Sequence, residues 1–205
     1  MEGKKVTIEI FRKKDAEGFS AAIADPDSRA DAGSAMAAVA ACSAALLHRA
    51  SMMCKAAWPE NEKLEYLIRN SEILRTYMVN LIDEDVKCRG PLRRAMKEGD
   101  ERSIEAGRQT GVSICAEIIH MMQTGLDLAS ELIPFVDLVS ASYVKESAEL
   151  ALAAAKGCVP YILMMGSYSS DDTYRFVIER ENELNMKAMQ ESHQKILDAL
   201  DAFPV

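Results

Sequence analysis

The sequence predicts an all-α fold in which a single domain spans residues 1–205. Three observations favour this prediction. Ala and Met are abundant while aromatic residues make up only 6% of the chain, and such a composition forms helices readily and strands poorly. Apolar residues recur about every 3.6 positions over long stretches. No repeat, low-complexity run or linker divides the 205 residues, so one helical bundle is the simplest arrangement.

The chain begins with two predicted helices separated by a loop. The first is amphipathic and covers residues 7–23, and the second covers residues 35–57 and ends at a Trp-Pro pair. Ser34 is expected to cap the second helix, with Asp31 close to its positive end. Because Ala occupies nearly every side of this helix, we expect it to lie at the centre of the bundle with close neighbours all round.

The most regular apolar stripe begins at Leu64 and predicts a long helix. Gly90-Pro91 is expected to interrupt or kink this helix, with residues 92–97 continuing it for a turn or two. Gly99-Asp100 predicts the next break. A second stripe over residues 104–122 then predicts a further helix, in which two glycines thin one face for a neighbouring backbone.

Two more helices complete the predicted bundle. Pro134 precedes a helix of small residues over positions 139–156, which Gly157 follows. A loop then leads to the last helix, and Asp171 or Asp172 is expected to cap it.

Charge and composition exclude several classes of function. The formal net charge of −8 disfavours a nucleic acid or an anionic membrane as the main partner. Residues 1–18 lack the apolar core of a signal peptide, and residues 35–47 are too short and too weakly hydrophobic to span a bilayer. Each of the five scattered Cys lies in an apolar helical context, which predicts buried, reduced thiols. None of the three His lies at ligand spacing from a Cys, so no metal site is expected. We therefore expect a soluble, cytoplasmic protein with no membrane or nucleic-acid partner.

Two acidic residues lie near the end of the regular stripe. Extending the stripe one turn beyond Leu81 reaches Asp85, which is therefore expected to point into the apolar seam. Because a buried carboxylate is costly unless paired, Asp85 is either an acid, base or substrate-orienting group, or a structural salt bridge or cap. Asp83 lies roughly 200° away around the helix. It is expected to face solvent or an interface and cannot form a close pair with Asp85.

The only dense run of basic residues follows these acids on the same predicted helix. It can bind the anionic tail of a ligand through bidentate Arg contacts, or it can be a solvated helix end balanced by acidic neighbours. The run consists of Lys87, Arg89, Arg93, Arg94 and Lys97.

Four features, in this order, resemble the formiminotetrahydrofolate cyclodeaminase/methenyltetrahydrofolate cyclohydrolase family. A loop and Gly-Ser precede a long Ala-rich helix, and residues 81–85 match that family's LIDED motif almost letter for letter. Residues 140–157 resemble its helix that ends in Gly, and a loop with Asp172 leads to the terminal helix. The resemblance covers essentially the whole chain. It implies an up-and-down helical bundle that forms a homodimer, a folate site in a cleft near the dimer interface, and a site strand or loop at residues 161–168.

The resemblance also implies a chemistry. The family's known reactions act on one-carbon units carried by tetrahydrofolate: one expels ammonia from a formimino group to close the methenyl ring, and the other opens that ring with water. No metal or tightly bound cofactor is implied, because the tetrahydrofolate derivative is the carried substrate. The catalytic candidates are Asp85 and Asp83.

Other site candidates lie where this chain departs from the family pattern. The family's Pro-Gly-Gly-Gly-Ser turn is Ala-Asp-Ala-Gly-Ser at residues 30–34. Its Ser-Asp pair falls on Ser142-Tyr143, one of its asparagines on Tyr161, and its aromatic after LIDED on Arg89. These departures leave an alternative open, namely a non-catalytic or re-purposed dimeric small-ligand-binding or scaffold protein. The substrate-binding candidates are Asp31, Gly33, Ser34, Arg89, Ser142 and Tyr161.

Overall fold

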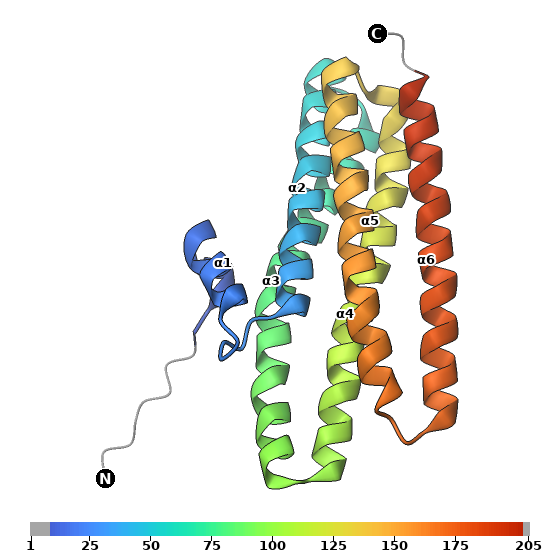
Figure 1. The fold of residues 1–205 in the computed structure, drawn as a ribbon. Helices are drawn as coiled ribbons and strands as arrows, with labels where there is room; N and C mark the ends of the chain where they lie inside the picture. The colour runs from blue at the N-terminus through green and yellow to red at the C-terminus, as the bar shows by residue number, and fades with distance from the viewer. Residues whose placement is uncertain (1–8, 203–205) are drawn as a thin grey trace.

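Every secondary-structure element in the described part of the chain is helical. The computed structural model describes residues 9–202, and no strand occurs within them. Five long helices lie side by side and alternate in direction along the chain (Figure 1). The prediction of an all-α, up-and-down bundle is confirmed. In chain order the elements are η1 (Phe11–Lys13), α1 (Ala16–Ala24), α2 (Ala32–Ala57), α3 (Glu62–Glu98), α4 (Glu101–Leu132), η2 (Ile133–Phe135), α5 (Leu138–Ser167) and α6 (Asp172–Asp201).

The small-faced helices α2 and α5 pack closely against each other. The Ser43 hydroxyl donates to the Ser147 carbonyl at 2.8 Å, and the Ser147 hydroxyl donates to the Ser43 carbonyl at 2.9 Å. Nearer the start of α2, a Cβ at Gly157 would come within 3.0 Å of the Met36 Cγ and closer still to its sulfur. By length and composition both helices are apolar enough to cross a membrane, and here part of that apolar surface lies inside the bundle.

Helix α3 runs unbroken through Pro91, so an interruption at Gly90-Pro91 is wrong, while the expected continuation over residues 92–97 is confirmed. A proline removes only one hydrogen bond within the helix, and packing against α4 holds the turn that follows. Leu92 fits against Gly107, where a Cβ would lie 3.0 Å from the Leu92 side chain. The break predicted at Gly99 is confirmed, because its φ of 72° is left-handed and terminates the helix.

Helix α5 also extends beyond its predicted end. The sequence predicts an end at Gly157 and a strand or loop over residues 161–168, and both predictions are wrong because α5 continues to Ser167. Gly157 lies against α2 instead of ending the helix. The connection to α6 is consequently short. Of the two N-cap candidates that the sequence offers for α6, Asp171 and Asp172, the structure shows Asp171.

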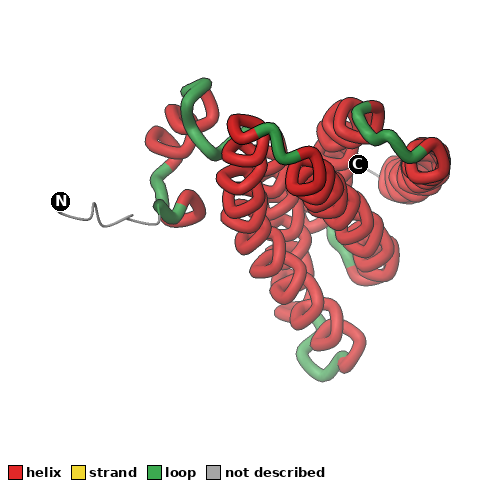
Figure 2. Tube along the Cα trace, turned by 90° about the horizontal axis from the view of Figure 1, so that it is seen from below, coloured by secondary structure: helices red, strands yellow, loops and turns green. Residues whose placement is uncertain are grey.

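The N-terminal segment docks on the outside of α3. Figures 1 and 2 show η1 and α1 to one side of the bundle, away from α6. Phe11 anchors η1 with only 2% of its surface exposed. The helix predicted over residues 7–23 begins only at Ala16, after the N-cap Asp15, and residues 7 and 8 lie outside the described residues.

Candidate functional site

Asp85 lies inside the bundle, where α3 meets the first turn of α2. Its side chain is 0% exposed, which confirms the prediction that it points to the apolar side of its helix. Its Oδ2 lies 3.0 Å from both the backbone nitrogen and the hydroxyl of Ser34. Its Oδ1 has one long contact, 3.5 Å to the Arg89 guanidinium. One carboxylate oxygen is therefore firmly held and the other only weakly.

The first turn of α2 leaves room for the Asp85 carboxylate and binds it. Asp31, and not Ser34, is the N-cap, since the Asp31 carboxylate accepts the Gly33 N–H at 3.3 Å. The Ser34 hydroxyl instead lies 3.0 Å from the Ile82 carbonyl as well as from Asp85. A Cβ at position 33 would lie 2.6 Å from the Asp85 Cγ, so only glycine fits there. The positive end of the helix also favours a carboxylate at this place.

Arg89 connects the buried carboxylate to the surface. It follows Asp85 by one turn of α3, and its guanidinium donates to Asp31 at 2.6 Å. The same guanidinium lies 4.4 Å from the ring centre of Tyr161, which α5 supplies. Arg89 is 8% exposed while the Asp31 side chain is 39% exposed. The ion pair therefore leads from the interior to solvent.

Two buried donors of this site have no hydrogen-bond partner among the described residues. They are Arg89 Nε–H and the Tyr161 hydroxyl. The hydroxyl lies against α4, where a Cβ at Gly111 would be 2.5 Å from it. Because buried donors are nearly always paired, these two mark a place suited to an acceptor on a ligand or to an ordered water.

Burial raises the pKa of Asp85 above its ordinary value. The charge of Arg89 opposes this shift and the charge of Asp31 reinforces it. Burial also raises the pKa of Tyr161, which keeps its hydroxyl protonated as a donor. The raised pKa makes Asp85 a stronger proton acceptor than an exposed aspartate.

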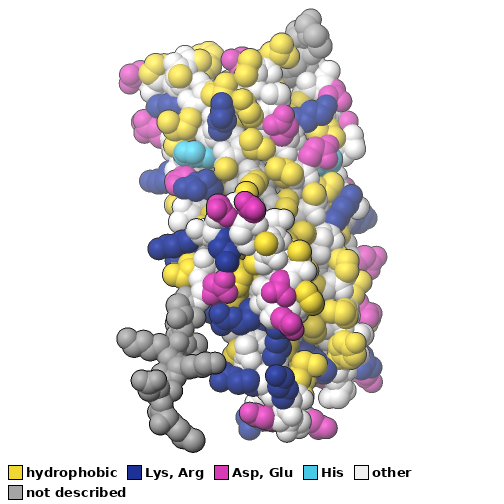
Figure 3. Space-filling model, turned by 60° about the vertical axis from the view of Figure 1, so that its left-hand side comes forward, with side chains coloured by type: hydrophobic (Ala, Val, Ile, Leu, Met, Phe, Trp, Pro, Cys, Tyr) yellow, Lys and Arg dark blue, Asp and Glu magenta, His cyan; other side chains and the backbone are white. Residues whose placement is uncertain are grey.

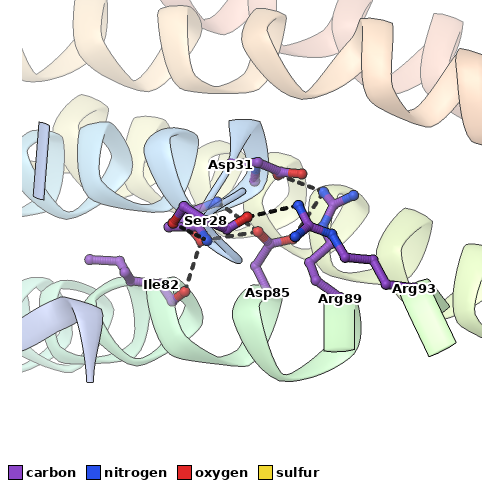
Figure 4. Close-up of polar contacts among 9 residues, drawn as sticks. Ser28, Asp31, Ile82, Asp85, Arg89 and Arg93 are labelled. Atoms are coloured by element: carbon purple, nitrogen blue, oxygen red, sulfur yellow. Dashed lines mark hydrogen bonds and ion pairs between the residues drawn. The ribbon is translucent and has the colours of Figure 1, made fainter. Parts of the chain in front are cut away.

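Basic side chains lie beside the loop that carries Asp31. Arg93 donates to the carbonyl oxygens of Asp27 at 3.1 Å and Ser28 at 2.7 Å, which fixes that loop to α3 (Figure 4). Arg93, Arg94 and Lys97 are exposed on the last turns of α3. Lys and Arg side chains gather in the lower part of the face that Figure 3 shows.

Six of the eight predicted site residues come together, and we call them the Asp85 cluster. They are contributed by the start of α2, by α3 and by α5, so three helices far apart in sequence meet here. Asp83 and Ser142 lie elsewhere. The members of the cluster are Asp31, Gly33, Ser34, Asp85, Arg89 and Tyr161.

Asp83 lies on another side of α3. It is only 7% exposed, so of the two expected surroundings solvent is wrong, and an interface stays a prediction. Its carboxylate accepts the Phe11 N–H at 2.8 Å and pairs with Arg12 Nε at 3.3 Å. Asp83 therefore holds η1 against α3. It lies apart from the cluster because side chains two positions apart on a helix, such as those of Asp83 and Asp85, point in directions that differ by more than half a turn.

Ser142 lies near the opposite end of α2 from the cluster. Its neighbour Tyr143 contacts Arg49, whose guanidinium is 4.8 Å from the Tyr143 ring centre. At 1.5 Å per residue, Arg49 is roughly 22 Å along α2 from Ser34. Ser142 is exposed, and its hydroxyl donates to the Val139 carbonyl of its own helix at 2.7 Å. The single chain therefore does not bring Ser142 to the cluster.

Sequence reasoning missed two thiols near the cluster. Cys115 and Cys158 are at most 1% exposed, and hydrogen bonding to Cys115, together with burial, raises the pKa of Cys158. Asp85 is near enough for its charge to reinforce that shift. No sequence spacing distinguishes these two residues from ordinary core cysteines. Cys42, in contrast, is exposed rather than buried as its apolar surroundings predict.

Comparison with known proteins gives both a family match and a fold match. The family described as formiminotransferase-cyclodeaminase matches residues 15–195 of the chain. The crystal structure of formiminotetrahydrofolate cyclodeaminase from Thermotoga maritima has a similar fold, with a TM-score of 0.85 and 18% identity. The match covers 92% of this chain and 96% of that one. No curated protein sequence matches this chain significantly.

Proposed function

The chain belongs to the formiminotransferase-cyclodeaminase family, and from that premise we propose that it acts on one-carbon derivatives of tetrahydrofolate at the Asp85 cluster. The observation that carries this proposal is a buried carboxylate oxygen close to two buried hydrogen-bond donors. Asp85 Oδ1 is weakly bound, while Arg89 Nε–H and the Tyr161 O–H have no partner among residues 9–202. Such a set is suited to a reaction in which one group moves a proton while neighbouring donors stabilise charge on a reacting oxygen or nitrogen.

In the cyclohydrolase reaction, Asp85 acts as the proton carrier. Water adds to the cationic methenyl carbon, and the carboxylate accepts the proton that the water loses as the carbon–oxygen bond forms. The bond from that carbon to one ring nitrogen then breaks, the nitrogen takes up a proton, and the added hydroxyl loses its proton to become the formyl oxygen. One proton is released to solvent overall. The Tyr161 and Arg89 donors stabilise the oxygen during this step.

The cyclodeaminase reaction places similar demands on the same group. A folate nitrogen attacks the formimino carbon and loses its proton, and the formimino nitrogen leaves as ammonia after gaining that proton and one from solvent. A carboxyl group with a raised pKa serves for both transfers.

Access to Asp85 depends on Arg89. The carboxylate is 0% exposed because Gly33, Ser34 and Arg89 enclose it. The Arg89 guanidinium is held more tightly by surface-facing Asp31, at 2.6 Å, than by Asp85, at 3.5 Å. Movement of Arg89 toward Asp31 and solvent would uncover Asp85 Oδ1 while Ser34 continues to hold Oδ2. The exposed Arg93, Arg94 and Lys97 nearby are suited to the anionic glutamate tail of a folate.

The decisive experiment follows the absorbance of methenyltetrahydrofolate with purified protein. We expect decay faster than in buffer, and a loss of at least about 100-fold in Asp85→Asn, the range over which general acid–base groups contribute. Asp127→Asn is the matched control, because Asp127 is exposed on α4 and its carboxylate accepts a hydrogen bond from Gln123 of the same helix. Release of ammonia from formiminotetrahydrofolate, assayed with the same three proteins, separates the two reactions. Wild-type rates equal to buffer in both assays would exclude the enzymatic proposal.

A second candidate function is a non-catalytic, ligand-binding member of the same fold. The Asp31–Arg89 ion pair favours it, because Asp31 stands where the family pattern has a glycine and Arg89, which stands where the pattern has an aromatic residue, covers Asp85. In that case a reduced folate or another metabolite would raise the melting temperature without turnover. A rise with reduced folates in both wild type and Asp85→Asn, with no turnover by either, would establish binding alone.

We also propose that two copies of the chain pair through the apolar face beside α1. A groove of about 650 Å³ there is lined by Phe19, Ile23, Val39 and Leu150 among others, an apolar surface of the kind that marks an interface. Light scattering after gel filtration should give the mass of a dimer, and Val39→Asp should give that of a monomer. A monomeric wild type would contradict the pairing without bearing on the reaction.

A further inference from the structure

A cavity separate from the Asp85 cluster lies between α4, α5 and α6. Its volume is about 200 Å³, and its walls are largely apolar, including Val112, Ile119, Ile162, Val177 and Ile178. An engineered apolar cavity of about 150 Å³ is known to hold benzene, so this one has room for a molecule built on a single ring.

One polar group in the cavity wall is buried without a partner. Asn182 of α6 is 9% exposed, and its Oδ1 has no hydrogen-bond partner within residues 9–202. An amide oxygen that has lost its water needs a donor, because the lost hydrogen bonds are otherwise not replaced. The lining also contains the polar residues Ser113, Tyr174, Glu181 and Asn185, but of the five polar lining residues only Asn182 offers a buried oxygen without a partner in residues 9–202. A few polar groups in an otherwise apolar wall are the usual composition of a small-molecule site.

The charge around the cavity restricts what can enter. Glu181 lies in the lining next to Asn182, and the lining residues include no Lys or Arg. The protein as a whole carries a formal charge of −8. An anionic ligand is therefore disfavoured, and a neutral or cationic ligand is favoured.

We propose that this cavity binds a small neutral or cationic organic molecule with a ring-sized apolar body and an N–H group that donates to Asn182 Oδ1. Primary amides and amines are the chemical classes that fit. The apolar walls bury the ring, the amide oxygen fixes the orientation of the N–H group, and the Glu181 carboxylate tolerates a positive charge. The site shares no residue with the Asp85 cluster, although Ile162 directly follows Tyr161 and Val112 directly follows Gly111.

Benzamide and benzoate test the proposal, since they have nearly the same shape and differ in the N–H group and the charge. We expect saturation-transfer NMR to show benzamide bound to the wild-type protein, with benzoate at least about tenfold weaker. Asn182→Leu, which keeps the side-chain volume but removes the amide, should weaken benzamide about tenfold, the effect of losing one hydrogen bond. Asn70→Leu is the matched control, because Asn70 lies on α3 and its amide donates only to the Tyr66 carbonyl.

A second variant keeps the test decisive if Asn182→Leu folds poorly. Ala116 also lines the cavity, and Ala116→Phe should fill it and abolish benzamide binding while circular dichroism remains that of a helical bundle. Absence of benzamide binding to the wild type would overturn the proposal. Equal binding of benzamide and benzoate, or benzamide binding that both variants leave unchanged, would overturn it as well.

Discussion

Asp83 and Asp85 are two carboxylates on one helix, both buried, and they have different roles. Asp83 accepts N–H groups from η1 and pairs with Arg12, whose side chain is 35% exposed, so it holds a surface segment in place. Asp85 meets the first turn of α2 and Arg89, away from solvent. The difference arises because two positions along a helix turn the side chain through more than half a circle. The LIDED motif of α3 therefore provides Asp83, which holds η1 in place, and Asp85, the candidate catalytic residue, on different sides of the helix.

The largest expected difference between the two is in global stability. Asp85→Ala removes the acceptor of the buried Ser34 N–H and leaves the Arg89 guanidinium with Asp31 as its remaining carboxylate partner. An unpaired buried donor costs about 1–3 kcal/mol, and more where a charged group is involved. Urea denaturation should therefore show a much lower midpoint than for the wild type. A cost below that of Asp83→Ala would contradict the proposed difference.

The close packing of Gly33 against Asp85 can be tested by adding one methyl group at position 33. Gly33→Ala would place a Cβ 2.6 Å from the Asp85 Cγ, and overpacking of this kind costs about 1–3 kcal/mol. Gly90→Ala on α3 is the control, because no atom lies within 4 Å of its added Cβ and a helical Ala is favoured over Gly by up to about 1 kcal/mol. The two substitutions should move the denaturation midpoint in opposite directions. If both stabilise the protein, the first turn of α2 is not as close to Asp85 as the geometry indicates.

Asp83→Ala should have a local effect. It removes the acceptor of the Phe11 N–H and the partner of Arg12, worth about 1–3 kcal/mol together when a buried donor is left unpaired. Hydrogen exchange should accelerate in η1 and α1 while the amides of α4 and α5 stay protected, since local opening does not require global unfolding. Faster exchange throughout the bundle would show that Asp83 supports the core.

The smallest effect concerns pH. Burial raises the pKa of Asp85 in the folded protein, so the folded state binds this proton more tightly than the unfolded chain. The resulting stability is fully present below the unfolded-state pKa and is lost as pH rises through the folded-state pKa. The stability of wild type relative to Asp85→Asn should therefore fall as pH increases from about 4, by at most about 1.4 kcal/mol per pH unit. If the relative stability rose with pH instead, the pKa of Asp85 would be lowered in the folded protein, and the prediction would be contradicted.

The sequence predicts the bundle well because helical period and proline or glycine breaks are local signals. The position of Asp85 follows from the phase of the stripe alone, and Gly99 ends α3 as expected. Gly157 and Pro91 mislead for the same reason, since what keeps both helices continuous is contact with another helix. Tertiary packing overrides local preference at these positions.

The site is predicted less completely. The resemblance selects Asp31, Arg89 and Tyr161, and the structure brings these three residues together. Their ion pair and ring contact depend on the closeness of α2, α3 and α5, which cannot be read from the sequence of any one helix. The docking of η1 on Asp83 joins residues 72 positions apart, and the distance of Ser142 from the cluster depends on the antiparallel course of α2 and α5. The periodicity of apolar residues in the sequence predicts neither the docking of η1 nor the position of Ser142.

The contact between Met36 and Gly157 has a chemical consequence. Met36 is partly exposed, but its sulfur packs against Gly157, so a sulfoxide formed there would add a polar oxygen where α5 leaves no room even for a methyl group. Oxidative damage at this one sulfur atom would push two helices apart less than two turns from Asp31, and would loosen the protein beside its candidate reaction centre first.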